Sequence, residues 1–184
     1  EISCSLVGSE MCIRDRVIDF ADDPTCLTLD RQYMFGDNIL VAPILNDEGI
    51  AEYYVPEGKW TDIITGKVLE GGKWYKHKCS YFEIPALAKP NSIIAYGNFE
   101  RQIEYDYLEG TTFTIYELED GKSAVCPIYD TEANKVFELT ATRHGNKIEC
   151  EYTDTKASFK IAVANTDKTV EIAPNFSGKV IIEL

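Results

Sequence analysis

Hydrophobic and polar residues alternate in short runs along most of the chain. Residues 111–118 and 136–142 switch between apolar and polar side chains with a period of two, which is the pattern of a half-buried β-strand. Residues 50–55 and 159–163 are also expected as strands. Turn residues separate such runs about every 8–12 residues, a spacing typical of a sandwich or a barrel. The pattern predicts an all-β chain.

One run is apolar at almost every position. Residues 38–45 read Asn-Ile-Leu-Val-Ala-Pro-Ile-Leu, which leaves no polar face for solvent. We expect a strand buried from two sides.

Helix signals are confined to the start of the chain. Asp22-Asp23-Pro24 places a carboxylate at an N-cap and a proline at the first helical position, so a short helix is predicted there. Asp30 predicts the cap of a second helical turn through residues 31–35, with Gly36 as the left-handed residue that ends it.

The turn signals divide the chain into two parts. Gly97-Asn98-Phe99 and the charged stretch after it interrupt the apolar rhythm, so we predict domains over residues 17–97 and 98–184. The expected fold class is all-β, with two antiparallel β-sandwich domains and one short helical segment near the start. The turns that support this assignment lie at residues 56–58, 65–66, 71–72, 89–92, 119–122 and 144–146.

Residues 1–16 do not follow this pattern. They show neither strand nor helix periodicity and no secretory apolar core. Residues 6–16, Leu-Val-Gly-Ser-Glu-Met-Cys-Ile-Arg-Asp-Arg, resemble the translation of a transposase-type sequencing adapter. We expect residues 1–16 to be a non-native segment.

Charge narrows the set of partners. The formal net charge is −13, from 18 Lys+Arg against 31 Asp+Glu, so the field of the protein repels phosphate backbones and anionic lipids. Nucleic acid and membranes are therefore not expected partners. Residues 73–78, Lys-Trp-Tyr-Lys-His-Lys, interleave basic and aromatic residues as a single-strand-binding surface does. We favour an edge strand protected by lysines instead.

Metal and redox sites are not indicated. The cysteines lack Cys-x-x-Cys spacing and the density of a disulfide scaffold, and we expect reduced, packed thiols. Neither His77 nor His144 has a second ligand at helical spacing, so no metal or cofactor is expected. The cysteines are Cys4, Cys12, Cys26, Cys79, Cys126 and Cys150.

Carboxylates and aromatic rings are the remaining candidates for chemistry. An acidic composition alone supplies potential general acids, and we favour solvated or capping roles for them, with Asp37 as a former of an Asx-type turn. Aromatic rings stack on sugars, but most are expected in the core, and alternation sends Tyr53 and Tyr54 to opposite faces, which allows one ring to point outward. The candidate acids are Asp19, Asp22, Asp37, Asp62 and Asp106, and the candidate rings are Tyr53, Tyr54, Trp60, Trp74, Tyr75, Tyr81 and Phe82.

Several short motifs occur in one order. They are Asp22-Asp23-Pro24, Asp-Arg-Gln-Tyr-Met-Phe-Gly-Asp at 30–37, Leu-Val-Ala-Pro at 40–43, Tyr-Val-Pro-Glu-Gly-Lys-Trp-Thr at 54–61, Thr65-Gly66 and Lys-Pro-Asn-Ser at 89–92. Together they resemble glycoside hydrolase family 31 just after its catalytic barrel. Residues 105–111, 118–121 and 124–126 resemble the bacterial α-xylosidase branch of that family.

The resemblance implies a C-terminal accessory fragment of a retaining α-glycosidase. Its two catalytic carboxylates, roughly 5–5.5 Å apart in retaining enzymes, would belong to an upstream barrel. No catalytic, cofactor-binding or metal-binding residue is therefore expected in this chain, and the chain alone is expected to be inactive. The parent enzyme would hydrolyse α-xylosyl ends of oligosaccharides. An α-glucosidase of the same family and a stand-alone carbohydrate-binding β-sandwich module are the alternatives, and an adhesion-type sandwich is a third.

The resemblance also implies partners. The sandwiches would support the chain's own upstream barrel, contribute to homo-oligomer contacts and meet the oligosaccharide substrate only through the parent enzyme, in the cytoplasm. In the family an arginine usually precedes the segment matched by residues 17–20, and here adapter-like sequence stands in its place, so the resemblance implies that the domain is truncated inside a strand. We expect the isolated chain to expose an apolar face and to associate.

Overall fold

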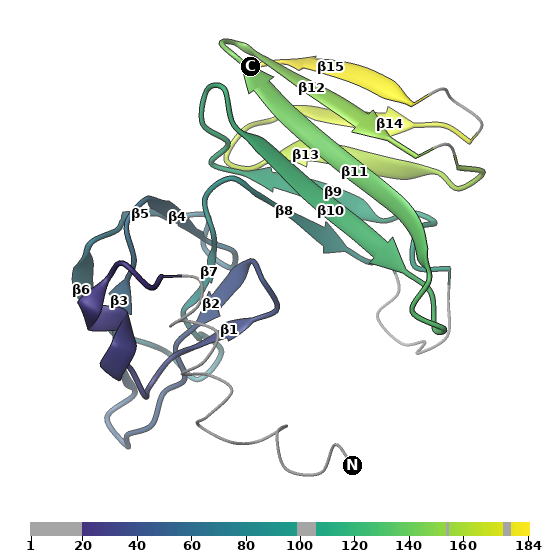
Figure 1. The fold of residues 1–184 in the computed structure, drawn as a ribbon. Coiled ribbons are helices and arrows are strands. Elements are labelled where there is room, and N and C mark those ends of the chain that lie inside the picture. The colour runs from purple at the N-terminus through teal and green to yellow at the C-terminus, as the bar shows by residue number, and fades with distance from the viewer. Residues whose placement is uncertain (1–19, 99–105, 154, 175–177) are drawn as a thin grey trace. The chain divides into compact units, whose positions relative to one another are not determined.

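A computed structural model describes residues 20–98, 106–153, 155–174 and 178–184, and the chain divides into two compact units, Glu1–Lys89 and Pro90–Leu184 (Figure 1). The segment expected to be non-native, residues 1–16, lies outside the described residues. Strands make up nearly all of the regular structure. The all-β fold class is confirmed.

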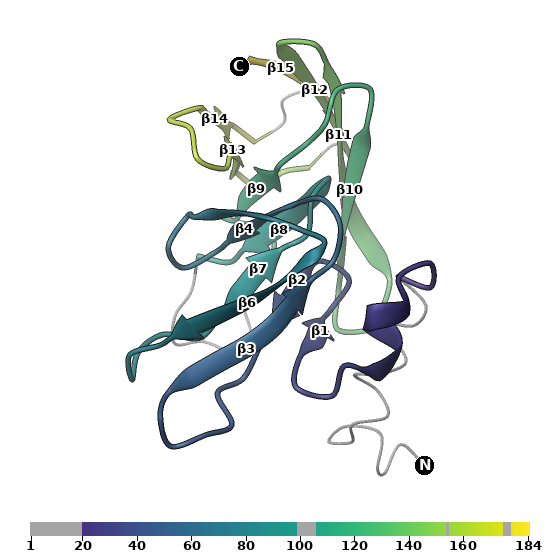
Figure 2. The ribbon, with the colours of Figure 1, turned by 90° about the vertical axis from the view of Figure 1, so that its left-hand side faces the viewer.

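The first unit contains two antiparallel sheets. Figure 2 shows β3 (Ile50–Val55) and β6 (Lys73–Lys78) paired as a ribbon of their own. The larger sheet has the order β1-β2-β7-β4-β5. Its strands are β1 (Tyr33–Phe35), β2 (Ile39–Val41), β7 (Ala86–Ala88), β4 (Lys59–Asp62) and β5 (Val68–Glu70).

Side chains from both sheets form one core. Trp60 of β4 is fully buried, and Tyr53 and Val55 of β3 belong to the same cluster as Leu40 and Leu87 of the larger sheet. The indole Nε1 of Trp60 donates to the carbonyl oxygen of Pro56 over 2.9 Å, so its one polar atom is satisfied. This packing of two sheets is the predicted sandwich.

The expected short helix is confirmed as the 3-10 helix η1 (Pro24–Thr28). The Oδ1 atom of Asp23, its N-cap, accepts from the backbone N–H of Thr25 over 3.0 Å. The second helical turn predicted through residues 31–35 is wrong. Tyr33–Phe35 pairs with β2 instead, which buries Met34 in the core, and Gly36, at φ 62°, serves the β1–β2 turn.

The apolar run 38–45 is buried only in part. Leu40, Val41 and Ala42 are buried as expected, and β2 lies between β1 and β7. Leu45 is 67% exposed because the strand has ended before it.

The second unit is a sandwich of two four-stranded sheets, ordered β10-β11-β12-β15 and β14-β13-β9-β8. One pairing differs from the predicted antiparallel pattern, because β9 and β13 run parallel, with Phe113 opposite Ile161. The strands are β8 (Ser92–Tyr96), β9 (Thr112–Tyr116), β10 (Ser123–Tyr129), β11 (Lys135–His144), β12 (Lys147–Tyr152), β13 (Phe159–Val163), β14 (Thr169–Ile172) and β15 (Lys179–Glu183).

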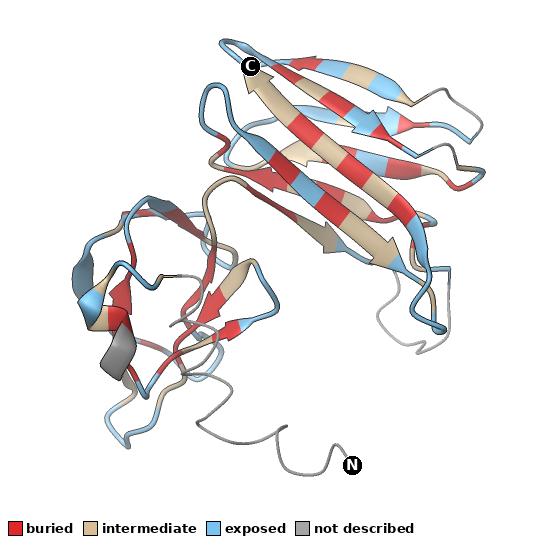
Figure 3. Ribbon diagram, viewed as in Figure 1, coloured by how far each residue is buried: buried red, intermediate tan, exposed pale blue. Residues whose placement is uncertain are grey.

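Aromatic rings fill the centre of this sandwich. Figure 3 shows buried positions alternating with less buried ones along β11 and β12. From them Phe137 meets Phe113 and Phe159 of the other sheet, and Tyr152 meets Phe159, with ring centroids 5.2–5.4 Å apart. The core of the second unit therefore depends on rings from both layers.

The division between the units lies before β8. The sequence predicted a boundary between residues 97 and 98, but β8 pairs with β9 and places Ile93 in the second core. The division therefore falls between Lys89 and Pro90. The apolar rhythm continues through β8, so it could not mark this change of sheet.

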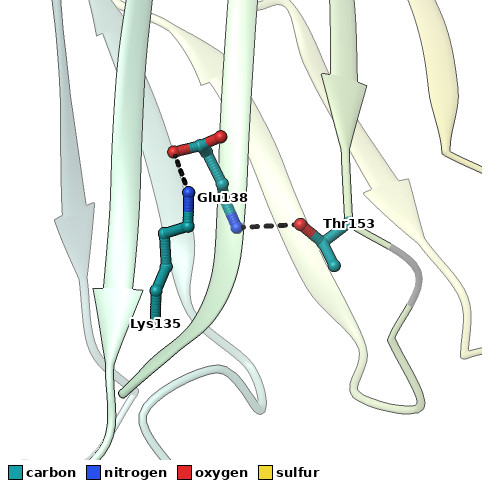
Figure 4. Close-up of polar contacts among 3 residues, drawn as sticks. All are labelled: Lys135, Glu138 and Thr153. Carbon is teal, nitrogen blue, oxygen red and sulfur yellow. Dashed lines mark hydrogen bonds and ion pairs between the residues drawn. The ribbon is translucent and has the colours of Figure 1, made fainter. Parts of the chain in front are cut away.

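Charged residues of the second unit lie at its surface. In Figure 4, Lys135 Nζ lies 2.9 Å from Glu138 Oε2, and the backbone N–H of Glu138 donates to Thr153 Oγ1 over 3.2 Å. Both charged side chains are at least a third exposed, and such ion pairs contribute little to stability. The contacts tie β11 to the residue after β12 without forming a buried polar site.

Candidate functional site

Two of the candidate acids, Asp62 and Asp106, stabilise turns through hydrogen bonds to the backbone. Asp62 Oδ1 accepts from the backbone N–H groups of Ile64 and Thr65, over 2.9 and 3.0 Å. Asp106 Oδ1 accepts in the same way from the second residue after it, Leu108, over 2.9 Å. Asp22 and Asp37 are exposed, and Asp19 lies outside the described residues.

One carboxylate attaches the start of η1 to the β3–β6 ribbon. Asp23 Oδ2 accepts from the hydroxyl of Tyr54 over 2.7 Å. Burial of Tyr54, together with this hydrogen bond to Asp23, raises the pKa of the phenol to about 12. The phenol therefore stays a donor across the physiological range.

Gln32 reinforces the same attachment. Its side chain is buried; its Oε1 accepts from the backbone N–H of Tyr54, and its Nε2 donates to the carbonyl of Tyr54, both over 2.8 Å. The amide thus takes the place of a neighbouring strand at this position. Residues 20–32, which we call the cover segment, are fixed at two points.

Two hollows lie where the cover segment meets β3 and β6. The larger is about 470 Å³ and includes the carboxylates of Asp22, Asp23 and Glu57 in its lining. The smaller is about 260 Å³ and is lined by Leu29, Asp30, Arg31, Gln32, Glu52 and Trp74. The smaller hollow combines an aromatic ring with charges of both signs.

The aromatic candidates fall into buried and exposed groups. Tyr53 and Tyr54 do lie on opposite faces, but both are buried, because Tyr54 packs with Cys26 and Leu29 of the cover segment. Trp60 is fully buried and Tyr75 is partly buried. Trp74 remains 55% exposed, with its ring centroid 5.7 Å from that of Tyr54.

A second exposed group lies in the turn before β7. Tyr81 is 95% exposed and Phe82 is 90% exposed, and their rings meet edge to face with centroids 5.4 Å apart. The backbone N–H of Ser80 donates to Glu83 Oε2 over 2.8 Å, and these hydrogen bonds from Ser80 lower the pKa of Glu83. The turn presents both rings outward.

Residues 73–78 form an edge, as expected. In the part of the chain that the structure describes, β6 pairs with β3 alone, and its three lysines are exposed. The interpretation as a lysine-protected edge strand is confirmed.

The cysteines in the described ranges are buried and form no disulfide, as expected: Cys26, Cys79, Cys126 and Cys150. Burial raises the pKa of Cys126 to about 11 and that of Cys150 to about 12, the latter with a contribution from Glu149, so both stay protonated at neutral pH. Cys4 and Cys12 lie outside the described residues.

The described residues lack two further features. They contain no cluster of three or more His, Cys, Asp or Glu side chains arranged to hold a metal ion. They also contain no helix long and apolar enough to cross a membrane.

Family models match the chain in two consecutive parts. Residues 9–94 match the glycosyl hydrolase family 31 C-terminal domain, and residues 106–184 match the C-terminal domain of the alpha-xylosidase YicI. The first match begins inside the segment that resembles an adapter.

Several of the curated relatives are α-xylosidases. XylQ of Lactiplantibacillus pentosus is 30% identical over 164 residues, which are 88% of this chain and 21% of the relative. An alpha-xylosidase of Emericella nidulans is 41% identical over 151 residues, 74% of this chain and 19% of the relative. The chain thus spans about a fifth of the length of these relatives.

Solved structures share the fold. The family 31 alpha-xylosidase of Xanthomonas citri aligns with a TM-score of 0.72 and 17% identity, over 91% of this chain and 21% of that chain. A cycloalternan-forming enzyme of Listeria monocytogenes aligns with a TM-score of 0.75 and 20% identity, over 92% and 20%. From these matches and the α-xylosidase relatives, the chain belongs to glycoside hydrolase family 31, as part of its C-terminal β-sandwich region.

Proposed function

We propose that this chain is the accessory C-terminal part of a retaining α-glycosidase that removes α-xylosyl ends from oligosaccharides. The observation that carries the proposal is the pair of matches to C-terminal domains, in order, with α-xylosidases among the relatives. Because the chain spans about a fifth of those relatives, the catalytic domain would belong to the rest of a longer protein.

The described carboxylates support an accessory role. A retaining glycosidase needs two carboxyl groups about 5–5.5 Å apart, one as nucleophile and one as acid and base. Asp23, Asp62 and Asp106 instead bind backbone N–H groups at a cap and at two turns. We infer that the chain has no catalytic, cofactor-binding or metal-binding residue and does not cleave glycosides alone.

The test compares the 184-residue chain with the polypeptide encoded by the complete gene. Both are assayed with p-nitrophenyl α-xyloside and α-glucoside. We expect no release above the blank from the chain, and faster release from the xyloside by the complete protein. Hydrolysis by the chain itself would contradict the proposal.

An α-glucosidase is the second candidate. It is favoured by the 32% identity over 121 residues to "Alpha-glucosidase 2" of Bacillus thermoamyloliquefaciens. Faster release from the α-glucoside by the complete protein would select it.

The turn at residues 80–83 is our proposed contact with the catalytic domain. Tyr81 and Phe82 are almost fully exposed, and large aromatic side chains are enriched in interfaces. The occupant is the remainder of the same polypeptide, because most of the length of the relatives lies outside this chain.

Removing these rings should reduce association of the isolated chain. We expect Y81S/F82S to lower both the scattering mass and hydrophobic-dye binding, because two apolar rings leave the surface. Static light scattering over a concentration series measures the effect. The control is Val125→Ser, which replaces a 49% exposed residue of β10. A parent chain that is monomeric and binds no dye contradicts this prediction.

Further parts of the proposal concern partners and location. The four described cysteines are buried and form no disulfide, which is typical of a reducing compartment, so we propose the cytoplasm. Contacts between copies of the complete enzyme would be a second role of the sandwiches. The net charge of −13 favours neutral sugars over nucleic acid.

A further inference from the structure

The register of the β3–β6 ribbon places Trp74 beside a charged pair. Tyr54 lies opposite Trp74, and Glu52 lies opposite Lys76. Residues directly opposite share a face, and diagonal neighbours on that face are about 7–8 Å apart. Glu52 and Trp74 are such diagonal neighbours, and both line the 260 Å³ hollow.

The other wall of the hollow comes from the cover segment. Gln32, which lines the hollow, is fixed by two hydrogen bonds to the backbone of Tyr54. Asp30 and Arg31 directly precede it and line the same hollow. Gln32 therefore anchors this wall of the hollow directly beside Asp30 and Arg31.

Trp74 is held in place as well as exposed. Its ring contacts the ring of Tyr54 at a centroid distance of 5.7 Å and an interplanar angle of 57°. Tyr54 is itself fixed through its hydroxyl to Asp23 and through its backbone to Gln32. A half-exposed indole on a fixed support is a preorganised stacking surface.

We propose that this hollow binds one sugar unit of a neutral oligosaccharide. The CH face of a pyranose would stack on Trp74, while its hydroxyl groups would donate to the carboxylates of Asp30 or Glu52 and accept from the guanidinium of Arg31. Sugar hydroxyls both donate and accept hydrogen bonds. A neutral sugar therefore fits a rim with charges of both signs better than an anion does. The volume of 260 Å³ is slightly below the roughly 300 Å³ where pockets for drug-sized ligands begin.

The site is an addition to the proposed function. It would hold a branch or end of the polymer near the enzyme without taking part in bond cleavage, and it uses residues of this chain alone. Its test is therefore separate from the activity assay, since the isolated chain can bind sugar whether or not the complete protein prefers xylose.

The two tryptophans make the test selective. Trp60 is fully buried, whereas Trp74 is 55% exposed, so Trp74 is the indole that a bound sugar can contact directly. We would titrate the chain with xyloglucan heptasaccharide and with maltoheptaose. A saturable change with either sugar is expected, and the ratio of the two dissociation constants identifies the preferred sugar.

Variants assign the binding to the hollow. Trp74→Ala should weaken binding roughly tenfold, measured by saturation-transfer NMR because this variant lacks the reporter. Glu52→Gln should weaken it severalfold while leaving the ring in place. Phe35→Ala, which removes a 66% exposed ring of the same unit that does not line the hollow, is the matched control and should bind as the parent does.

Folding is checked by circular dichroism for each protein. No saturable response to either sugar in the folded parent chain would overturn the proposal. Equal binding by the parent, W74A and E52Q would also overturn it, because the sugar would then lie elsewhere.

Discussion

Phe137→Ala is expected to lower the free energy of unfolding of the second unit by about 3–5 kcal/mol. Phe137 is 1% exposed, and its ring meets those of Phe113, Tyr152 and Phe159, with centroids 5.2–6.4 Å away. Truncation removes the ring that joins both sheets and leaves a cavity that three large neighbours cannot close. Urea unfolding followed by circular dichroism measures the loss.

The neighbouring residue provides the control for Phe137. Val136 lies on the same strand, is 49% exposed and faces away from the core. Val136→Ala should change the free energy of unfolding by less than about 0.5 kcal/mol. Equal losses for the two variants would show that the aromatic cluster is not the centre of the unit's stability.

Gly71→Ala is expected to destabilise the first unit by about 2–4 kcal/mol. A Cβ at position 71 would lie 1.8 Å from the carbonyl oxygen of Pro56, which is backbone and cannot rotate away. The N–H of Gly71 donates to the carbonyl of Gly58 over 2.7 Å, so moving the chain also breaks that hydrogen bond.

The Gly71→Ala substitution should also perturb the core of the first unit through Trp60. Its indole donates to the same Pro56 carbonyl, so displacement of that group should shift the emission of Trp60 to the red, measured in a Trp74→Phe background. Gly72→Ala is the comparison, because no atom lies closer than 3.9 Å to its added Cβ and only its φ of +75° is strained. That strain costs about 1–2 kcal/mol. A G72A variant less stable than G71A would contradict the clash argument.

Local patterns predicted the strands well and their partners poorly. Alternation at residues 111–118 and 136–142 predicted β9 and β11, and Asp23-Pro24 predicted the start of η1. Residues 31–35 misled because a cap and a terminal glycine are local signals, whereas β1 is stabilised by pairing with β2. β10 and β7 were not anticipated as strands at all, since β10 contains Pro127 and β7 has only three residues, all of them buried.

The candidate site shows the same limit. Alternation correctly separated Tyr53 from Tyr54, but it could not show that the cover segment buries the outer ring. The hydrogen bonds of Gln32 could not be predicted, because no sequence pattern links a glutamine side chain to a backbone group 22 residues away. The diagonal placement of Glu52 and Trp74 on one face could be derived only after the register of the β3–β6 ribbon was known.

The parallel pairing of β9 with β13 has a consequence for synthesis on the ribosome. β9 leaves the exit tunnel before β10, β11 and β12, which separate it from β13 in the chain. Until β13 emerges, β9 has an open edge, a template for wrong partners. We expect nascent chains halted before residue 159 to be the species that chaperones retain.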